Sequence, residues 1–192
     1  MNKRFVRNLL IGLIVGLMVT GVVIIKAGDC DGTTGNDTIV CSANPNNPDQ
    51  NVNGDLGNDN ITVDAGVTVT FIDADGDGIG QSTGNGGNDV IVNNGTVNND
   101  ISGDFVTGAA GNDTITNNGT VNGTIYGDEA SGTVTASGND TIVNSGTVAG
   151  DIIADDNLTA GGNDSITNNG QIAGNIDAGG GTDSVELVQQ AM

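Results

Sequence analysis

One pattern of polar and apolar residues is repeated four times along the chain, and each copy opens with Gly-Asn-Asp. The copies are separated by 24, 27 and 24 residues, and they begin at Gly87, Gly111, Gly138 and Gly162. Weaker copies are GNDTIV from Gly35, GNDNITV from Gly57 and GTDSVELV from Gly181. A period of this size indicates a solenoid in which each repeat forms one coil.

Within each strong copy, three β-branched positions keep a constant spacing of six residues and then four. The three columns are Ile91, Ile115, Ile142, Ile166; Val97, Val121, Val148, Ile172; and Ile101, Ile125, Ile152, Ile176. β-Branched residues between polar neighbours favour short strands with one face inward. The Asn-Asn-Gly or Asn-Ser-Gly between the first two columns is typical of a corner.

These observations predict an all-β fold, a single parallel β-solenoid of about six coils of roughly 24 residues. Successive coils would stack ~4.8 Å apart, so that identical residues lie on one another. The corner residues Asn93, Asn117, Asn144 and Asn168 would then form a ladder of side-chain amides.

The first 27 residues have a different composition. Lys3, Arg4 and Arg7 precede an uncharged, almost wholly apolar run from Leu9 to Ile25. This pattern predicts a hydrophobic helix that serves as a signal peptide or an N-terminal membrane anchor over residues 1–27. The rest of the chain would be secreted or displayed at the cell surface, with membrane contact only through residues 5–25 if they are retained. We expect a cap at 28–50, solenoid repeats at 51–188 and a tail at 189–192.

The charge is strongly asymmetric. The chain has 24 acidic and four basic residues, and no Lys, Arg or His follows Lys26. Such a surface has nothing to neutralise phosphate, so we expect no nucleic-acid partner. It attracts divalent cations; the alternative interpretation is an adaptation for solubility or high salt.

Two cysteines, Cys30 and Cys41, follow the hydrophobic run. An even pair in an exported chain predicts a disulfide. Metal binding by this pair is disfavoured, because the chain has no His and no further Cys.

The repeated aspartates form two columns of stacked carboxylates, of which the first is a candidate metal site. One column is Asp89, Asp113, Asp140 and Asp164, and a second, 15 residues later in three copies, is Asp104, Asp128 and Asp155. Stacked carboxylates repel by about 1 kcal/mol in water and more where the effective dielectric is lower. Ca²⁺ relieves this repulsion because it accepts several carboxylate and carbonyl oxygens. We therefore expect structural Ca²⁺ at the first column; the alternative is that each Asp caps its own turn.

A further candidate lies in FIDADGDGIG, which starts at Phe71. Asp73, Asp75 and Asp77, followed by Gly78, match the first half of a calcium loop. The twelfth position is Gly84 instead of Glu, so this is not an EF-hand. The hypothesis is a half-loop calcium site, and the alternative is an acidic surface turn.

The segments GNDTITNNGTVNGTIYGD and GNDTIVNSGTVAGDIIAD resemble β-helical passenger repeats of bacterial autotransporters and related surface adhesins. GGNDVIV and AGNDTIT also resemble the hemolysin-type (RTX) calcium repeat. That repeat recurs every nine residues, whereas Gly-Asn-Asp here recurs every 19 to 30, so its calcium geometry is not carried over whole. The resemblance implies a surface β-helix.

We expect an exported, acidic, calcium-stabilised solenoid with a structural or adhesive role at the cell surface. Its candidate partners are further copies, stacked through open coil edges, or surface glycans. We expect no enzyme and no catalytic residues, because the exported part lacks Lys, Arg and His and has only Phe71, Phe105 and Tyr126 as aromatics. One alternative is a glycan-binding or glycan-cleaving β-helix. The other is an ice-binding-type surface protein, for which Thr96, Thr120 and Thr147 stack in register until Gln171 interrupts them.

Overall fold

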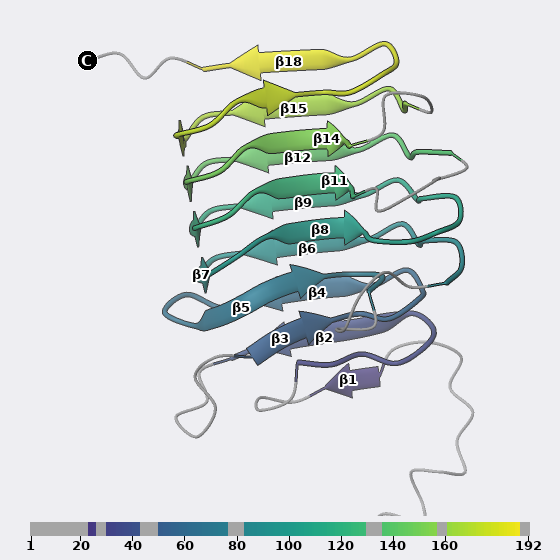
Figure 1. The fold of residues 1–192 in the computed structure, drawn as a ribbon. Helices are drawn as coiled ribbons and strands as arrows, with labels where there is room; N and C mark the ends of the chain where they lie inside the picture. The colour runs from purple at the N-terminus through teal and green to yellow at the C-terminus, as the bar shows by residue number, and fades with distance from the viewer. Residues whose placement is uncertain are drawn as a thin grey trace, which may run out of the picture.

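The computed structural model describes residues 23–25, 30–42, 50–76, 83–129, 136–156 and 161–188. It is a parallel β-solenoid of about five turns, with no helix among these residues (Figure 1). Each complete coil runs from the first sheet to the second sheet and back. Each coil therefore adds one strand to the first sheet.

The first sheet has eight parallel strands, and every strand after β1 follows one of the Gly-Asn-Asp copies. In spatial order they are β1 (Val23–Ile25), β2 (Asp37–Cys41), β4 (Asn60–Val63), β6 (Val90–Asn93), β9 (Thr114–Asn117), β12 (Thr141–Asn144), β15 (Ser165–Asn168) and β18 (Ser184–Leu187).

The second sheet contains the remaining strands. In the later coils, the segment in this sheet is divided into two strands, the first of two residues and the second of two or four residues. The strands are β3 (Gln50–Asn53), β5 (Thr68–Asp73), β7 (Thr96–Val97), β8 (Ile101–Asp104), β10 (Thr120–Val121), β11 (Ile125–Asp128), β13 (Thr147–Val148), β14 (Ile152–Asp155), β16 (Gln171–Ile172) and β17 (Ile176–Asp177).

The predicted apolar columns form the core. Ile91, Ile115 and Ile142 pair in register across β6, β9 and β12, and all three are fully buried. The Val97 and Ile101 columns are equally buried through the third strong copy, whereas Ile172 and Ile176 are only partly buried. Each of the three β-branched positions of a repeat therefore faces the interior of the solenoid, as the alternation with polar residues predicted.

The predicted amide ladder is also confirmed. Nδ2 of Asn93, Asn117 and Asn144 each donates to Oδ1 of the Asn one coil further on, at 2.8 Å in every case. These side chains are buried, so the ladder satisfies amide groups that water cannot reach.

The coil number and the N-terminal element differ from prediction. The weak copy from Gly181 supplies only β18 in the described part of the chain, so it does not form a complete coil there. The predicted hydrophobic helix lies mostly outside the described residues, but its last three residues form strand β1 and pair in parallel with β2. Val-Ile-Ile is β-branched throughout, which suits a strand at a sheet edge.

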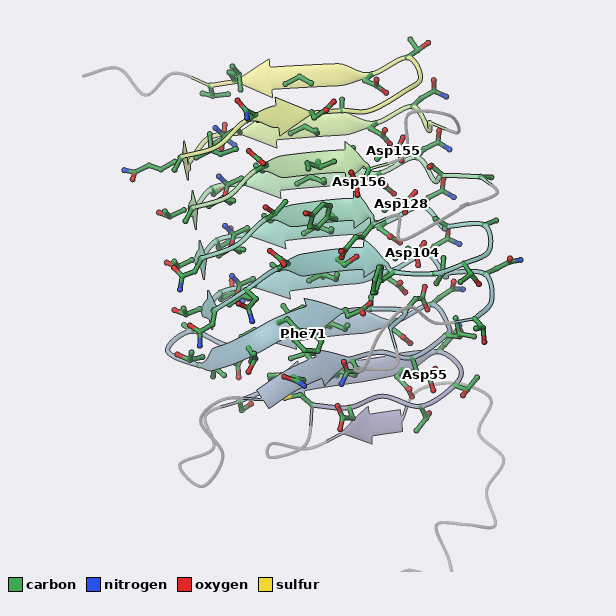
Figure 2. The ribbon with its side chains drawn as sticks, in the orientation of Figure 1. Asp55, Phe71, Asp104, Asp128, Asp155 and Asp156 are labelled. Atoms are coloured by element: carbon green, nitrogen blue, oxygen red, sulfur yellow. A yellow bond between two sulfur atoms is a disulfide. The ribbon has the colours of Figure 1, made fainter. Side chains whose placement is uncertain are left out.

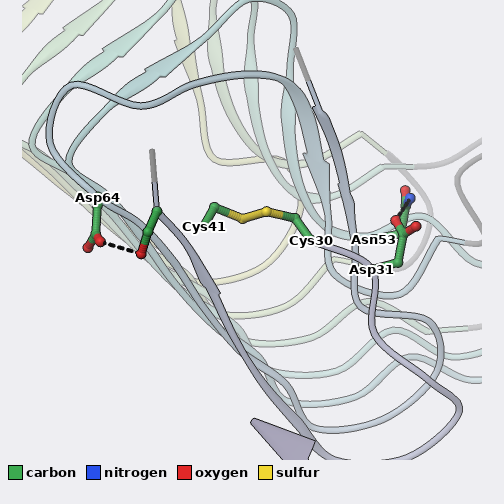
Figure 3. Close-up of a disulfide and its surroundings, with 6 residues drawn as sticks. Cys30, Asp31, Cys41, Asn53 and Asp64 are labelled. Atoms are coloured by element: carbon green, nitrogen blue, oxygen red, sulfur yellow. Dashed lines mark hydrogen bonds between the residues drawn. A yellow bond between two sulfur atoms is a disulfide. The ribbon is translucent and has the colours of Figure 1, made fainter. Parts of the chain in front are cut away.

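A disulfide joins Cys30 and Cys41 inside the first described coil (Figure 3). Both residues are buried in the core. Close by, Asn53 donates to Asp31 at 2.8 Å and Ser42 to Asp64 at 2.9 Å, which adds polar contacts between neighbouring coils.

Candidate metal centre

Two columns of aspartates face each other along one edge of the solenoid. The first, here called the corner column, is formed by the third residue of each Gly-Asn-Asp copy: Asp37, Asp59, Asp89, Asp113, Asp140, Asp164 and Asp183. The second, here called the strand-end column, lies at or just beyond the ends of β5, β8, β11 and β14: Asp75, Asp104, Asp128 and Asp155. Figure 2 shows Asp104, Asp128 and Asp155 one above another at this edge.

From Asp59 onward, each corner-column carboxylate is held by the coil before it. The backbone N–H of Asp89 donates to Oδ1 of Asp113 at 2.8 Å, and that of Asp113 donates to Oδ1 of Asp140 at 2.8 Å. The same bond recurs along the column from Asp37 to Asp183, at 2.6 to 3.0 Å. These aspartates therefore cap the turn of the preceding coil, whereas Asp37 accepts from the N–H of Thr33 in its own coil.

Each strand-end carboxylate accepts from a Gly-Asn-Asp glycine. Oδ2 of Asp128 accepts from the N–H of Gly138, and Oδ2 of Asp155 from that of Gly162, both at 2.7 Å. Asp104 and Asp75 make the corresponding bonds with Gly111 and Gly87. In both columns a backbone donor thus fixes one oxygen of the carboxylate.

In eight of these carboxylates the second oxygen is buried and has no hydrogen-bond partner. This holds for Oδ2 of Asp59, Asp89, Asp113, Asp140 and Asp164, and for Oδ1 of Asp104, Asp128 and Asp155. The eight side chains are at most 3% exposed. An unpartnered buried acceptor costs about 1–3 kcal/mol, and more if it is charged.

Carboxylate oxygens of the two columns converge into three clusters of three residues. The clusters are Asp75, Asp89, Asp104; Asp104, Asp113, Asp128; and Asp128, Asp140, Asp155. In each, one oxygen from every residue lies within 4.8 Å of the other two. In the first cluster, both oxygens of Asp75 accept from backbone N–H groups, those of Gly57 and Gly87. No cationic side chain is available to offset the charge, because the last basic residue of the sequence is Lys26.

Burial is the main cause of the raised pKa values in these clusters. It raises the pKa of Asp104 to about 12, with the nearby Asp75 carboxyl adding to the effect. Burial raises the pKa of Asp89 and Asp128 to about 9, and that of Asp140 to about 8. The pKa of Asp113 is also well above its ordinary value, from burial and from the carboxylates of Asp89 and Asp140. Without a cation, the folded chain therefore favours the protonated carboxyls.

Small residues next to the strand-end column leave room for the unpartnered oxygens. A Cβ on Gly103 would lie 2.1 Å from Oδ2 of Asp113, and one on Gly127 would lie 2.3 Å from Oδ2 of Asp140. The neighbouring coil has Ala154 at this position, which is also fully buried. The space at the clusters is consequently occupied by carboxylate oxygens and not by apolar side chains.

The clusters contain some, but not all, of the predicted metal ligands. Asp75, Asp89, Asp113 and Asp140 belong to them. Asp73 and Asp164 belong to no three-carboxylate cluster of the described residues, and Asp77 lies outside those residues. Asp73 and Asp75 therefore share no three-carboxylate cluster among the described residues, and the half-loop calcium site stays a prediction.

Asp104, Asp128 and Asp155 were recognised in the sequence as a column but not as candidate ligands. They complete every cluster in the structure. Their constant offset of 15 residues from the corner column was the available signal.

The row of clusters ends for identifiable reasons. Beyond Asp155, the register Ile153–Asp177 brings Gly179 to the strand-end position, so Asp164 has no third carboxylate there. At the other end, the register Asn53–Asp73 brings Asp55 to this position. Asp55 has a positive φ of 65° and accepts from the exposed hydroxyl of Thr34 at 3.0 Å, so it turns out of the row.

The donor set consists only of oxygens, most of them from carboxylates. This chemistry fits a hard divalent cation such as Ca²⁺ or Mg²⁺, and it does not fit the softer metals that prefer thiolate or imidazole. Such an ion would be held by Asp75, Asp89, Asp104, Asp113, Asp128, Asp140 and Asp155.

No protein-family model, curated protein or solved structure matches this chain. Within the described ranges, no helix has the length and apolar character needed to cross a membrane.

Proposed function

We propose that this chain is an exported surface protein with a structural or adhesive role, and that Ca²⁺ holds its solenoid rigid. The observation that carries the proposal is the row of seven buried carboxylates, six of them with an unpartnered oxygen, in a sequence without a basic residue after Lys26. A fold that needs divalent cations suits the cell exterior, where modules with Kd values of about 10⁻⁴–10⁻³ M are loaded.

Three features of the sequence support export and a surface role. The basic start and the apolar run from Leu9 to Ile25 are typical of an export signal or anchor. The Cys30–Cys41 disulfide is typical of an oxidising compartment. The resemblance of the repeats to bacterial surface β-helices indicates the same location.

Circular dichroism with thermal melting of the full-length chain tests the calcium dependence. Saturation of one site at 100 times its Kd contributes about 2.7 kcal/mol. Three sites would contribute about 8 kcal/mol, equivalent to a rise of roughly 15–30 °C in Tm for a chain of this size. An unchanged Tm in excess chelator would contradict the proposal. Protease treatment of intact producing cells tests surface display, because a chain that stays protected from protease is not displayed.

Self-association is part of the same proposal. Strand β18 ends the first sheet, and its residues Val185 and Leu187 are 47% and 62% exposed. Val188, which follows the strand, is 45% exposed. An open strand edge with apolar side chains favours pairing with another copy. Sedimentation velocity at increasing concentration should show association, and Leu187→Lys should abolish it. A wild-type chain that stays monomeric at all concentrations would exclude this contact.

The outer face of the eight-stranded sheet favours one second candidate, ice binding. Its outward residues are uncharged from β2 to β15 and form two columns: Thr38, Asn60, Val90, Thr114, Thr141, Ser165, and Val40, Thr62, Val92, Thr116, Val143, Thr167. In so acidic a protein this is a regular neutral array of methyl and hydroxyl groups, with about 4.8 Å between strands. The predicted column Thr96, Thr120, Thr147 lies on the other sheet.

Thermal hysteresis measurements distinguish these faces. If the eight-stranded sheet binds ice, Thr116→Tyr should abolish hysteresis and Thr147→Tyr should retain it. The reverse result would assign binding to the other sheet, and the absence of hysteresis in the wild type would exclude the ice-binding candidate.

A further inference from the structure

The three carboxylate clusters are not independent of one another. Each contains one corner-column residue between two strand-end residues of adjacent coils. Asp104 belongs to the first and second clusters, and Asp128 belongs to the second and third. The nine cluster positions are therefore filled by seven residues, because two residues are counted twice.

The hydrogen bonds explain how one carboxylate can serve two clusters. In Asp128, the backbone N–H of Gly138 fixes Oδ2, while Oδ1 is buried and has no hydrogen-bond partner. The unpartnered Oδ2 of Asp113 lies on one side of Asp128 in the row, and the unpartnered Oδ2 of Asp140 lies on the other. Asp113, by contrast, belongs to one cluster only.

The charges of such a row nearly balance. Three divalent cations carry six positive charges, and the seven carboxylates carry seven negative charges when ionised. Neighbouring ions would be separated by roughly the coil spacing of 4.8 Å. A carboxylate shared between two ions lies between them and screens their repulsion, which is the arrangement that a single file of cations requires.

We infer that the solenoid binds a single file of three Ca²⁺ ions, one per cluster, in which Asp104 and Asp128 each bridge two ions. This inference rests on the proposed calcium dependence and adds the stoichiometry and the bridging residues. The file stops at three because Asp55 turns away at one end and Gly179 has no carboxylate at the other. Bridging makes binding cooperative, since an ion in the middle site positions both shared carboxylates for its neighbours.

Equilibrium dialysis of the full-length chain against radioactive calcium tests this inference through an unequal loss of ions. The wild type should bind three ions. Asp113→Asn should bind two, because only the middle cluster is damaged, and Asp128→Asn should bind one. Asp156→Asn is the matched control and should bind three, because Asp156 adjoins the row in sequence but is exposed.

A second pair of variants keeps the test informative if Asp128→Asn fails to fold in calcium. Asp89→Asn should lose one ion and Asp104→Asn should lose two. The single file would be overturned if the two variants of each pair lost the same number of calcium ions. Binding of three ions by all four variants would overturn it as well.

The two proposals can fail separately. If calcium raises the Tm but the paired variants lose equal numbers of ions, the calcium-stabilised surface protein is supported and the single file is not. The three, two and one pattern in a chain that stays protected from protease in intact cells would establish the file and contradict the surface role.

Discussion

The backbone N–H of Asp113 donates to Oδ1 of Asp140 in the next coil at 2.8 Å, and this bond leaves Oδ2 of Asp140 buried and without a partner. One oxygen of the carboxylate thus joins two coils, and the other faces Asp128 and Asp155. The same residue stabilises the stack by its hydrogen bond and opposes it by its charge.

Replacement of Asp140 with Asn should therefore have opposite effects with and without calcium. The Asn Oδ1 can still accept from Asp113, and its Nδ2 can donate to a neighbouring carboxylate, so in chelator we expect about 1 kcal/mol of stabilisation. This equals a rise of roughly 2–4 °C in Tm. In calcium the variant should melt below the wild type because a ligand is lost. Melting curves under both conditions check this, with Asp156→Asn as the control that should change little; a decrease in both would contradict it.

The metal-free chain should lose stability as the pH rises. Burial raises the pKa of Asp164 to about 7, of Asp140 to about 8 and of Asp89 to about 9, while the unfolded chain ionises near the ordinary value of 3.8. Between these limits the folded chain binds more protons than the unfolded one, so stability is greatest near pH 4 and falls through pH 7–9. Each Asp that stays protonated contributes a slope of about 1.4 kcal/mol per pH unit.

Chemical denaturation of the chelated chain from pH 4 to pH 9 measures this fall, and saturating calcium should remove most of it. A metal-free chain that is most stable near pH 7 would argue against the buried carboxylates as the dominant groups.

Replacement of Asn117 with Ala should lower the free energy of unfolding strongly, whereas replacement of Asn118 should not. Asn117 accepts from Nδ2 of Asn93 and donates to Oδ1 of Asn144, both inside the solenoid. Asn117→Ala leaves both groups unsatisfied and should destabilise by about 2–4 kcal/mol. Asn118 forms an exposed bond to Asn94, so Asn118→Ala should change stability by less than about 0.5 kcal/mol. Equal losses in urea denaturation would show that burial of the ladder does not matter.

The glycine of Gly-Asn-Asp is required by the approach of two backbones. A Cβ on Gly111 would lie 1.2 Å from the carbonyl oxygen of Gly87 in the preceding coil, and no side-chain rotation relieves that contact. We expect Gly111→Ala to prevent folding or to cost more than about 3 kcal/mol, like the most damaging overpacked variants.

Gly84→Ala is the control, because its Cβ would meet only a methyl group of Leu56, at 2.9 Å. Expression yield and urea midpoints of the two variants test the difference, and a well-folded Gly111→Ala variant would show that the coils can separate locally.

The sequence predicted the stack well because its apolar register is constant. Ile91, Val97 and Ile101 recur at the same spacing in every strong copy, and this spacing specifies which residues face inward. The corner column was predicted for the same reason. Among the strand-end residues, only Asp75 was predicted as a ligand, as part of a half-loop. The others were not, because the distance from each strand-end residue to its glycine partner varies: Asp75 and Gly87 are 12 residues apart, Asp128 and Gly138 are 10, and Asp155 and Gly162 are 7. A sequence pattern cannot show that segments of different length bring the two columns face to face.

The N-terminal strand was missed for another reason. Val23, Ile24 and Ile25 continue an apolar run, and such a run has no polar alternation to distinguish a strand from the end of a helix. Only the pairing with Asp37–Ile39 reveals it.

The stacking of Gly111 on Gly87, and of Gly138 on Gly111, has a consequence for how such a gene can change. The coils that begin at Gly87, Gly111 and Gly138 each present the same glycine, the same amide and the same two carboxylates to their neighbours, so the joints between these coils are interchangeable. Recombination that deletes or duplicates one whole repeat would rejoin matching surfaces and keep the cation file in line, altering only the number of ions. The length of the rod is therefore open to selection in steps of one coil, without any need to evolve a new interface.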